Sequence, residues 1–191
     1  MAQRSIRTAL ALALGVGLGP CALLPSVRAE SGPPPAAVQP PPLVQTSGLP
    51  VPRFVSLKSD RVHLRQGPGT DYKVLWVYRR AGLPVEVIRE FDGWRQVRDA
   101  EGTTGWVLQS LVSGRRTVLI MPWENKAANP PPLVLRADDR DNARAVAIME
   151  PGVLATVRSC DGRWCYLSIG QHRGYFEQKR LWGVYEDEKF K

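Results

Sequence analysis

Residues 62–111 read VHLRQGPGTDYKVLWVYRRAGLPVEVIREFDGWRQVRDAEGTTGWVLQSL, and residues 133–181 pass through the same landmarks in the same order. Each copy has a Leu-Arg pair, a polar loop, a glycine, an Asp-Gly turn before a tryptophan, and a late glycine followed by an aromatic residue. The offset between the copies is about 70 residues. Repetition at a fixed period indicates repeated structural units. The sequence therefore predicts two copies of one small module.

Short apolar stretches separated by turn residues make up each copy. Residues 83–87 alternate between apolar and other residues, which is the period of a strand with one buried face. Asp92-Gly93 predicts a hairpin, because glycine accepts the positive φ that tight turns need. Residues 116–120 look like the last strand of the first unit. About five short strands per unit predict an all-β fold of two small barrels in tandem.

The N-terminus is typical of an export signal. Arg4 and Arg7 precede a nearly uncharged run, and residues 27–29 place small residues where a signal peptidase reads them. A membrane anchor is the competing interpretation, but this run is short and interrupted by glycines and a proline. Lipid attachment at Cys21 is a third, and Pro20 argues against it because lipidated cysteines follow a small residue. We expect cleavage after Ala29, no stable membrane insertion afterwards, and a periplasmic or secreted protein.

A proline-rich stretch follows the signal. Residues 30–52 contain eight prolines and a single charge, too little apolar surface to offset the entropy of ordering. We interpret the stretch as a disordered tether, with a docking peptide as the alternative. The expected organisation is a signal peptide at 1–29, a Pro-rich linker at 30–52, a first domain at 53–121, a connector at 122–131, a second domain at 132–185 and a tail at 186–191.

Cysteine content and charge narrow the possible partners. Cleavage removes Cys21 and leaves Cys160 and Cys165, which flank an Asp-Gly turn and so fall on facing strands close enough for a disulfide. A redox-active or metal-binding pair is the alternative.

Three arginines and no acid leave with the signal, so the net charge falls from +8 to +5. This mild positive charge favours anionic partners such as wall polymers. It is too sparse for a nucleic-acid-binding face.

The first unit resembles the bacterial SH3-like (SH3b) family. The resemblance rests on a strand ending in Arg65, the Gly67-Pro68-Gly69 loop, Gly82, Trp94 and Gly105-Trp106-Val107. In the second unit the loop after Arg136 reads ADDRDNARA, without glycine or proline, so fewer landmarks carry the resemblance there. The family implies two SH3-like barrels. It also implies a non-catalytic attachment or interaction module on an exported protein. Several members of the family bind peptidoglycan or its peptide stems.

Aromatic residues concentrate in the first unit and give the best candidate site. Five rings fall within 35 residues, and a barrel of this size cannot easily bury all of them: Tyr72, Trp76, Tyr78, Trp94 and Trp106. Trp106 is expected in the core, and an alignment of Trp76 and Tyr78 with Val146 and Ile148 suggests that they are buried too. The hypothesis is a shallow cleft in which basic side chains pair with ligand carboxylates. Its predicted ligand-binding residues are Arg65, Tyr72, Arg79, Arg80 and Trp94.

Catalysis finds no support in the residue inventory. His63 and His172 lie in different units and have no nearby nucleophile with an orienting carboxylate. Two histidines in separate units make no metal site either, and the acidic run from Asp138 to Asp141 lacks the glycine and glutamate of a calcium loop. We expect no enzyme, no metal and no cofactor. The predicted function is recognition of peptidoglycan or its peptide stems in the cell envelope, with binding of a Pro-rich peptide or an envelope protein as the alternative.

Overall fold

The computed structural model describes residues 47–120 and 131–191, which belong to one compact unit spanning Pro41–Lys191. The predicted signal peptide, most of the Pro-rich linker and most of the connector lie outside the described residues. The described chain folds into two sheets of short strands, as the all-β prediction requires. No helix in this part of the chain is long and apolar enough to cross a membrane.

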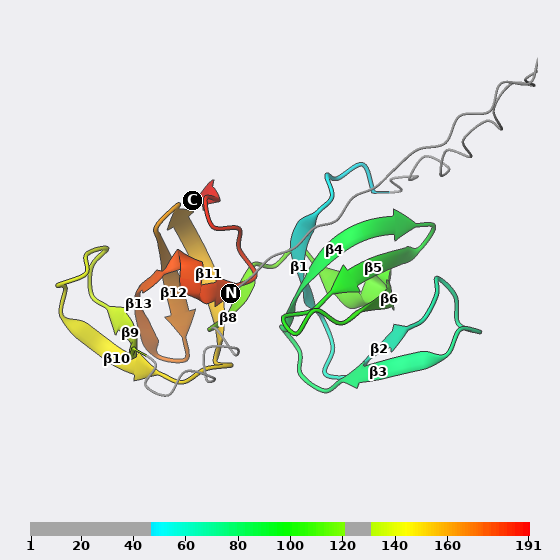
Figure 1. Cartoon of the computed structure of the whole chain (residues 1–191), viewed down its shortest axis with the longest axis horizontal. Helices are drawn as coiled ribbons and strands as arrows, with labels where there is room; N and C mark the ends of the chain where they lie inside the picture. Colours follow the sequence, from blue (N-terminus) through cyan, green and yellow to red (C-terminus); the bar gives the residue numbers. More distant parts are fainter. Residues whose placement is uncertain (1–46, 121–130) are drawn as a thin grey trace, which may run out of the picture. The chain divides into compact units, whose positions relative to one another are not determined.

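The first barrel is a seven-stranded sheet in the order β3-β2-β6-β5-β4-β1-β7 (Figure 1). Its elements are β1 (Arg53–Leu57), β2 (Val62–Arg65), β3 (Val74–Tyr78), β4 (Pro84–Phe91), β5 (Trp94–Arg98), β6 (Thr104–Leu108), the 3-10 helix η1 (Gln109–Leu111) and β7 (Val112–Ser113). Alternation places one face of each strand inside, so Val62 and Leu64 of β2 are buried. They pack with valines of β4, β5 and β6 in one core.

The second barrel repeats this order strand for strand, as β10-β9-β13-β12-β11-β8-β14, with β15 added beside β11. Its elements are β8 (Thr117–Ile120), β9 (Leu133–Arg136), β10 (Ala145–Met149), β11 (Leu154–Asp161), β12 (Trp164–Ile169), β13 (His172–Glu177), the 3-10 helix η3 (Gln178–Arg180), β14 (Leu181–Trp182) and β15 (Lys189–Phe190). Identical strand orders confirm that the sequence repeat is a structural repeat. Its core includes Leu133, Leu135, Phe176 and both cysteines.

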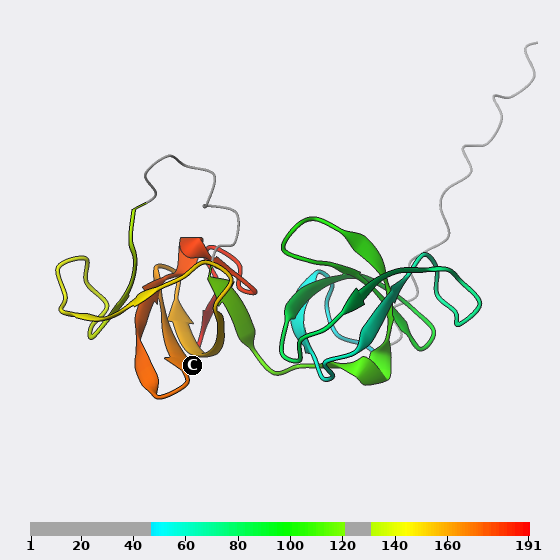
Figure 2. The same cartoon turned by 90° about the horizontal axis from the view of Figure 1, so that it is seen from below.

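The strand at 117–120 belongs to the second barrel and not to the first, so its predicted place was wrong. β8 pairs with β11 and β14, just as β1 pairs with β4 and β7. In both views green β8 lies among the yellow-to-red strands (Figures 1 and 2). The crossing between barrels is therefore residues 114–116, and the predicted connector falls between the first and second strands of the second barrel. The predicted tail likewise contains β15, paired with β11.

The hairpin turns carry the expected Asp-Gly pairs with one difference. In the first barrel the positive φ falls on Asp92, at 47°, whereas in the second it falls on Gly162, at 100°. Aspartate tolerates the left-handed region better than most residues with a side chain. The hairpin prediction is confirmed in both units.

The closing run of the second barrel contacts the first. Phe54 packs against the rings of Trp182 and Tyr185, with centroids 5.1 and 4.8 Å away. The indole of Trp182 donates to the Pro84 carbonyl at 3.2 Å, and the Tyr185 hydroxyl donates to Glu86 at 3.0 Å. These residues join β1 and β4 of one sheet to β14 of the other and to the residues that follow it.

Candidate functional site

Arg65 and Tyr72 shape the Gly-Pro-Gly loop of the first barrel. The Arg65 guanidinium donates to the carbonyl oxygens of Thr70 and Tyr72, at 2.7 and 2.8 Å. The Tyr72 ring, 49% exposed, lies directly on the loop glycines. A Cβ added at Gly67 would stand 2.4 Å from that ring, so glycine is needed for a close approach within the loop. One guanidinium nitrogen of Arg65 thus holds the loop, and its ligand-binding role stays a prediction.

The other predicted ligand-binding residues lie on other strands and turns of the first barrel. Trp94 begins β5 opposite Phe91 and is half-buried. Arg79 and Arg80 are exposed just after β3, and Arg80 donates to the Gly152 carbonyl at 3.2 Å. No hydrogen bond or ring-to-ring contact joins Tyr72 to Trp94 within residues 47–120. The cleft proposed between these two rings stays a prediction.

A groove elsewhere on the first barrel is the better candidate. It has a volume of about 310 Å³ and lies between β3, the start of β4 and the β5–β6 turn. We call it the Trp76 groove. Its lining is mostly apolar and consists of Leu75, Trp76, Tyr78, Leu83, Pro84, Val85, residues 99–101, Thr103 and Leu119. Leu119 in this lining comes from β8 of the second barrel.

Trp76 is an inward-facing ring that the barrel leaves uncovered. It pairs with Leu64, and Tyr78 pairs with Val62, so the two aromatic side chains share the face of buried residues. Tyr78 is 6% exposed and Trp76 is 60% exposed, although both lie on β3, the last strand in the sheet order. The expected burial of Tyr78 is confirmed, and that of Trp76 was wrong.

The sequence alignment of the two copies was wrong by one residue at β3 and β10, and this error hid the exposure of Trp76. Leu64 pairs with Trp76 in the first barrel, and its equivalent Leu135 pairs with Ala147 in the second. Trp76 therefore corresponds to Ala147, not to Val146 as the sequence alignment had it. Shifting a strand by one residue moves every side chain to the other face. With the correct register, the sequence shows an aromatic ring where the other copy has a small side chain.

Two carboxylates stand at the rim of the groove. The Tyr78 hydroxyl donates to Asp99 at 3.0 Å, while the other Asp99 oxygen accepts backbone N–H groups of Glu101 and Thr103. Burial and the adjacent Asp99 carboxylate raise the pKa of Tyr78, so its phenol stays protonated. Glu101 is exposed, and the lining contains no Lys or Arg. The groove therefore offers an apolar floor with a negative edge.

The bacterial SH3 domain model matches this sequence twice, over residues 58–114 and 129–183, together more than half of the chain. The chain belongs to the bacterial SH3 domain family. Both matched segments begin after the first strand of their barrel, β1 or β8. Each SH3 domain thus includes a strand that precedes the recognisable motif, which explains why β8 was misplaced from sequence.

Two solved structures are similar at low level. NlpC1 from Trichomonas vaginalis has 12% identity and a TM-score of 0.31, with 73% of this chain and 48% of that chain covered. NlpC2 from the same organism has 11% identity and a TM-score of 0.31, with 69% and 48% covered. The match thus spans about half of each solved chain, and likenesses at this TM-score carry no argument about function. No curated protein matches the sequence.

The second SH3 domain contains the predicted disulfide. Cys160 and Cys165 pair across β11 and β12, are bonded with their Cα atoms 4.1 Å apart, and lie in the core.

The carboxylates of the acidic loop form ion pairs: Asp138 pairs with Arg140, and Asp141 pairs with Arg163. Within the described ranges no cluster of three or more His, Cys, Asp or Glu side chains could hold a metal.

Proposed function

We propose that this protein is an exported, non-catalytic binding module that recognises peptidoglycan through its peptide stems, with the Trp76 groove of the first SH3 domain as the binding site. The observation that carries the proposal is the exposed, inward-facing Trp76 over an apolar floor with an acidic rim. Membership of the bacterial SH3 family supports a role as a binding module at the cell wall.

The groove suits the chemistry of a stem peptide bearing a free ammonium group. Alanine methyl groups fit a floor made by Trp76 and Leu83. The ammonium of an uncross-linked diamino acid would find the carboxylates of Asp99 and Glu101, and a cation over the Trp76 face gains a further attraction. Carboxylates of the stem would point away from this rim.

Export is part of the proposal. The predicted signal peptide supports it, and so does the disulfide, because disulfides persist in oxidising compartments such as the periplasm.

A sedimentation assay with purified wall sacculi tests the proposal. We expect the Trp76→Ala variant to lose most of its binding. Ile148→Ala is the matched control, since Ile148 is 75% exposed on β10 of the second domain. Equal loss from the two variants would exclude the groove. Loss from Tyr72→Ala without loss from Trp76→Ala would instead place the site at the originally predicted loop.

Binding of a protein segment is the second candidate, and the open edge of β3 favours it. β3 ends the sheet order, so a peptide strand could add to it with Leu75 and Trp76 alongside. A peptide of residues 30–46 added to a chain beginning at Ser47 tests this in its intramolecular form. Amide shifts confined to β3 would support it, and an unchanged spectrum would rule out this segment as the ligand.

A further inference from the structure

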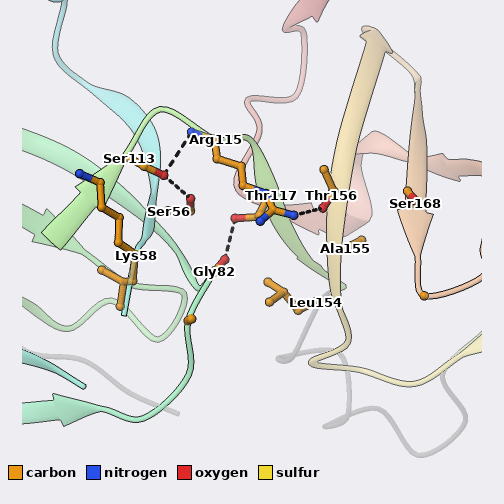
Figure 3. A pocket seen from close by; sticks show the side chains of 13 residues that line it. Ser56, Lys58, Gly82, Ser113, Arg115, Thr117, Leu154, Ala155, Thr156 and Ser168 are labelled. Carbon is orange, nitrogen blue, oxygen red and sulfur yellow. Dashed lines mark hydrogen bonds between the residues drawn. The ribbon is translucent and has the colours of Figure 1, made fainter. Parts of the chain in front are cut away.

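A hollow lined by basic residues is a second candidate site, opposite in charge to the Trp76 groove. Two cavities of about 400 and 630 Å³ share Arg115, Thr156, Ser168 and Gly170 in their linings, so they adjoin. We call this the basic hollow. Its charged and hydroxyl-bearing side chains include Lys58, Arg115, Thr156, Arg158 and Ser168. Figure 3 shows the first of the two cavities, with Lys58 and Arg115 labelled.

The hollow concentrates positive charge without compensation. Neither lining contains an aspartate or glutamate. Arg116 also lines it, but Glu188 neutralises that guanidinium at 2.7 Å. Lys58, Arg115 and Arg158 form no ion pair with any described residue. Three uncompensated cations around one hollow create a local positive potential that attracts anions.

Hydroxyl groups and a held guanidinium give the hollow specific donors. Arg115 donates to the Thr156 hydroxyl at 3.2 Å, as the dashed line in Figure 3 marks. The Ser113 hydroxyl lies 3.1 Å from that of Ser56, and Ser168 lines the same cavity. Arg115 therefore keeps most of its five N–H donors available while its position is partly set. A planar guanidinium beside hydroxyl donors matches the several acceptor oxygens of a phosphate group.

We infer that the basic hollow binds phosphate-bearing anions through Lys58, Arg115 and Arg158. The two adjoining cavities together have room for more than one phosphate, as in a polyphosphate or a row of phospholipid headgroups. The hollow is opposite in charge to the Trp76 groove, so the two sites select different groups. The inference does not rest on recognition of wall peptides.

Titration of the full mature chain with tripolyphosphate at low ionic strength tests the inference. The probe variant combines Lys58→Gln, Arg115→Gln and Arg158→Gln, all at exposed positions. The control combines Arg61→Gln, Arg89→Gln and Arg144→Gln, which are exposed, lie outside the hollow and remove the same net charge. We expect binding to weaken about tenfold or more in the probe variant, since charge-assisted hydrogen bonds are lost, and about twofold or less in the control.

A parallel arm separates the two sources of phosphate. Flotation with phosphatidylglycerol vesicles, compared with phosphatidylcholine vesicles, reports headgroup binding. Binding in either arm that the probe variant alone loses supports the site and identifies the source. Equal weakening of probe and control variants would reduce the effect to net charge and overturn the inference, as would absence of wild-type binding in both arms. Trp76→Ala should leave phosphate binding unchanged, so this test and the sacculus test fail independently.

Discussion

Glu90 of β4 is the residue whose replacement should most destabilise the first SH3 domain. Its side chain is fully buried and accepts hydrogen bonds from Arg53, Arg95 and both the backbone N–H and hydroxyl of Ser47. Arg95 is itself 1% exposed. The change Glu90→Gln keeps the shape and removes the charge. It leaves a buried guanidinium without its counter-ion and turns an amide N–H₂ toward groups that are already donors.

Two arguments give the same magnitude for this change. Removing one partner of a buried ion pair costs about 3–5 kcal/mol. Burial raises the pKa of the Glu90 carboxyl, but hydrogen bonds from Arg53 and Ser47 together with the Arg53 charge bring it down from 4.5 to about 2. A shift of that size corresponds to about 3 kcal/mol between the two protonation states. We therefore expect Glu90→Gln to lower the free energy of unfolding by about 3 kcal/mol at pH 7.

The pH dependence distinguishes charge from packing. The unfolded carboxyl titrates near 4.5 and the folded one near 2, so the unfolded state binds more protons between these values. The Glu90 contribution is complete above about pH 5 and disappears as pH falls through 2. Urea titrations followed by amide signals of β4 and β5 should show a wild-type advantage that shrinks on acidification. Glu150→Gln, at an exposed position, should change little. A constant difference from pH 7 to pH 2 would refute the role of the charge.

Two further perturbations test local features of each domain. Replacing Cys160 and Cys165 by serine should lower the free energy of unfolding of the second domain by about 2 kcal/mol, the chain-entropy value for so short a loop. Urea unfolding measures the change, and two free thiols in native protein purified without reductant would contradict the disulfide. Gly67→Ala should displace the Tyr72 ring, because the new Cβ would stand 2.4 Å from it. Chemical shifts of the Tyr72 ring should move while those of the core stay, and an unmoved ring would show that the loop can relax instead.

The predicted elements were accurate wherever a local signal existed. The hairpins, the alternating strands and the disulfide each depend on residues within a few positions of one another, which is why pattern reading found them. β8 was assigned to the wrong barrel because its four residues carry no mark of the strand they pair with. The predicted site residues were chosen by residue type, and type alone does not show that Arg65 also holds its own loop through one guanidinium nitrogen.

The repeat of residues 62–111 in 133–181 was enough by itself to determine two small β domains of one family. Turn residues and the apolar-polar alternation of strands are patterns of residues close together in the sequence. Only the tertiary structure decided which side chains were left uncovered. The strand face on which Trp76 lies follows from the pairing register of β2 and β3, and the basic hollow brings together cations from the distant positions 58, 115 and 158. Such features depend on long-range pairing, which no local pattern records.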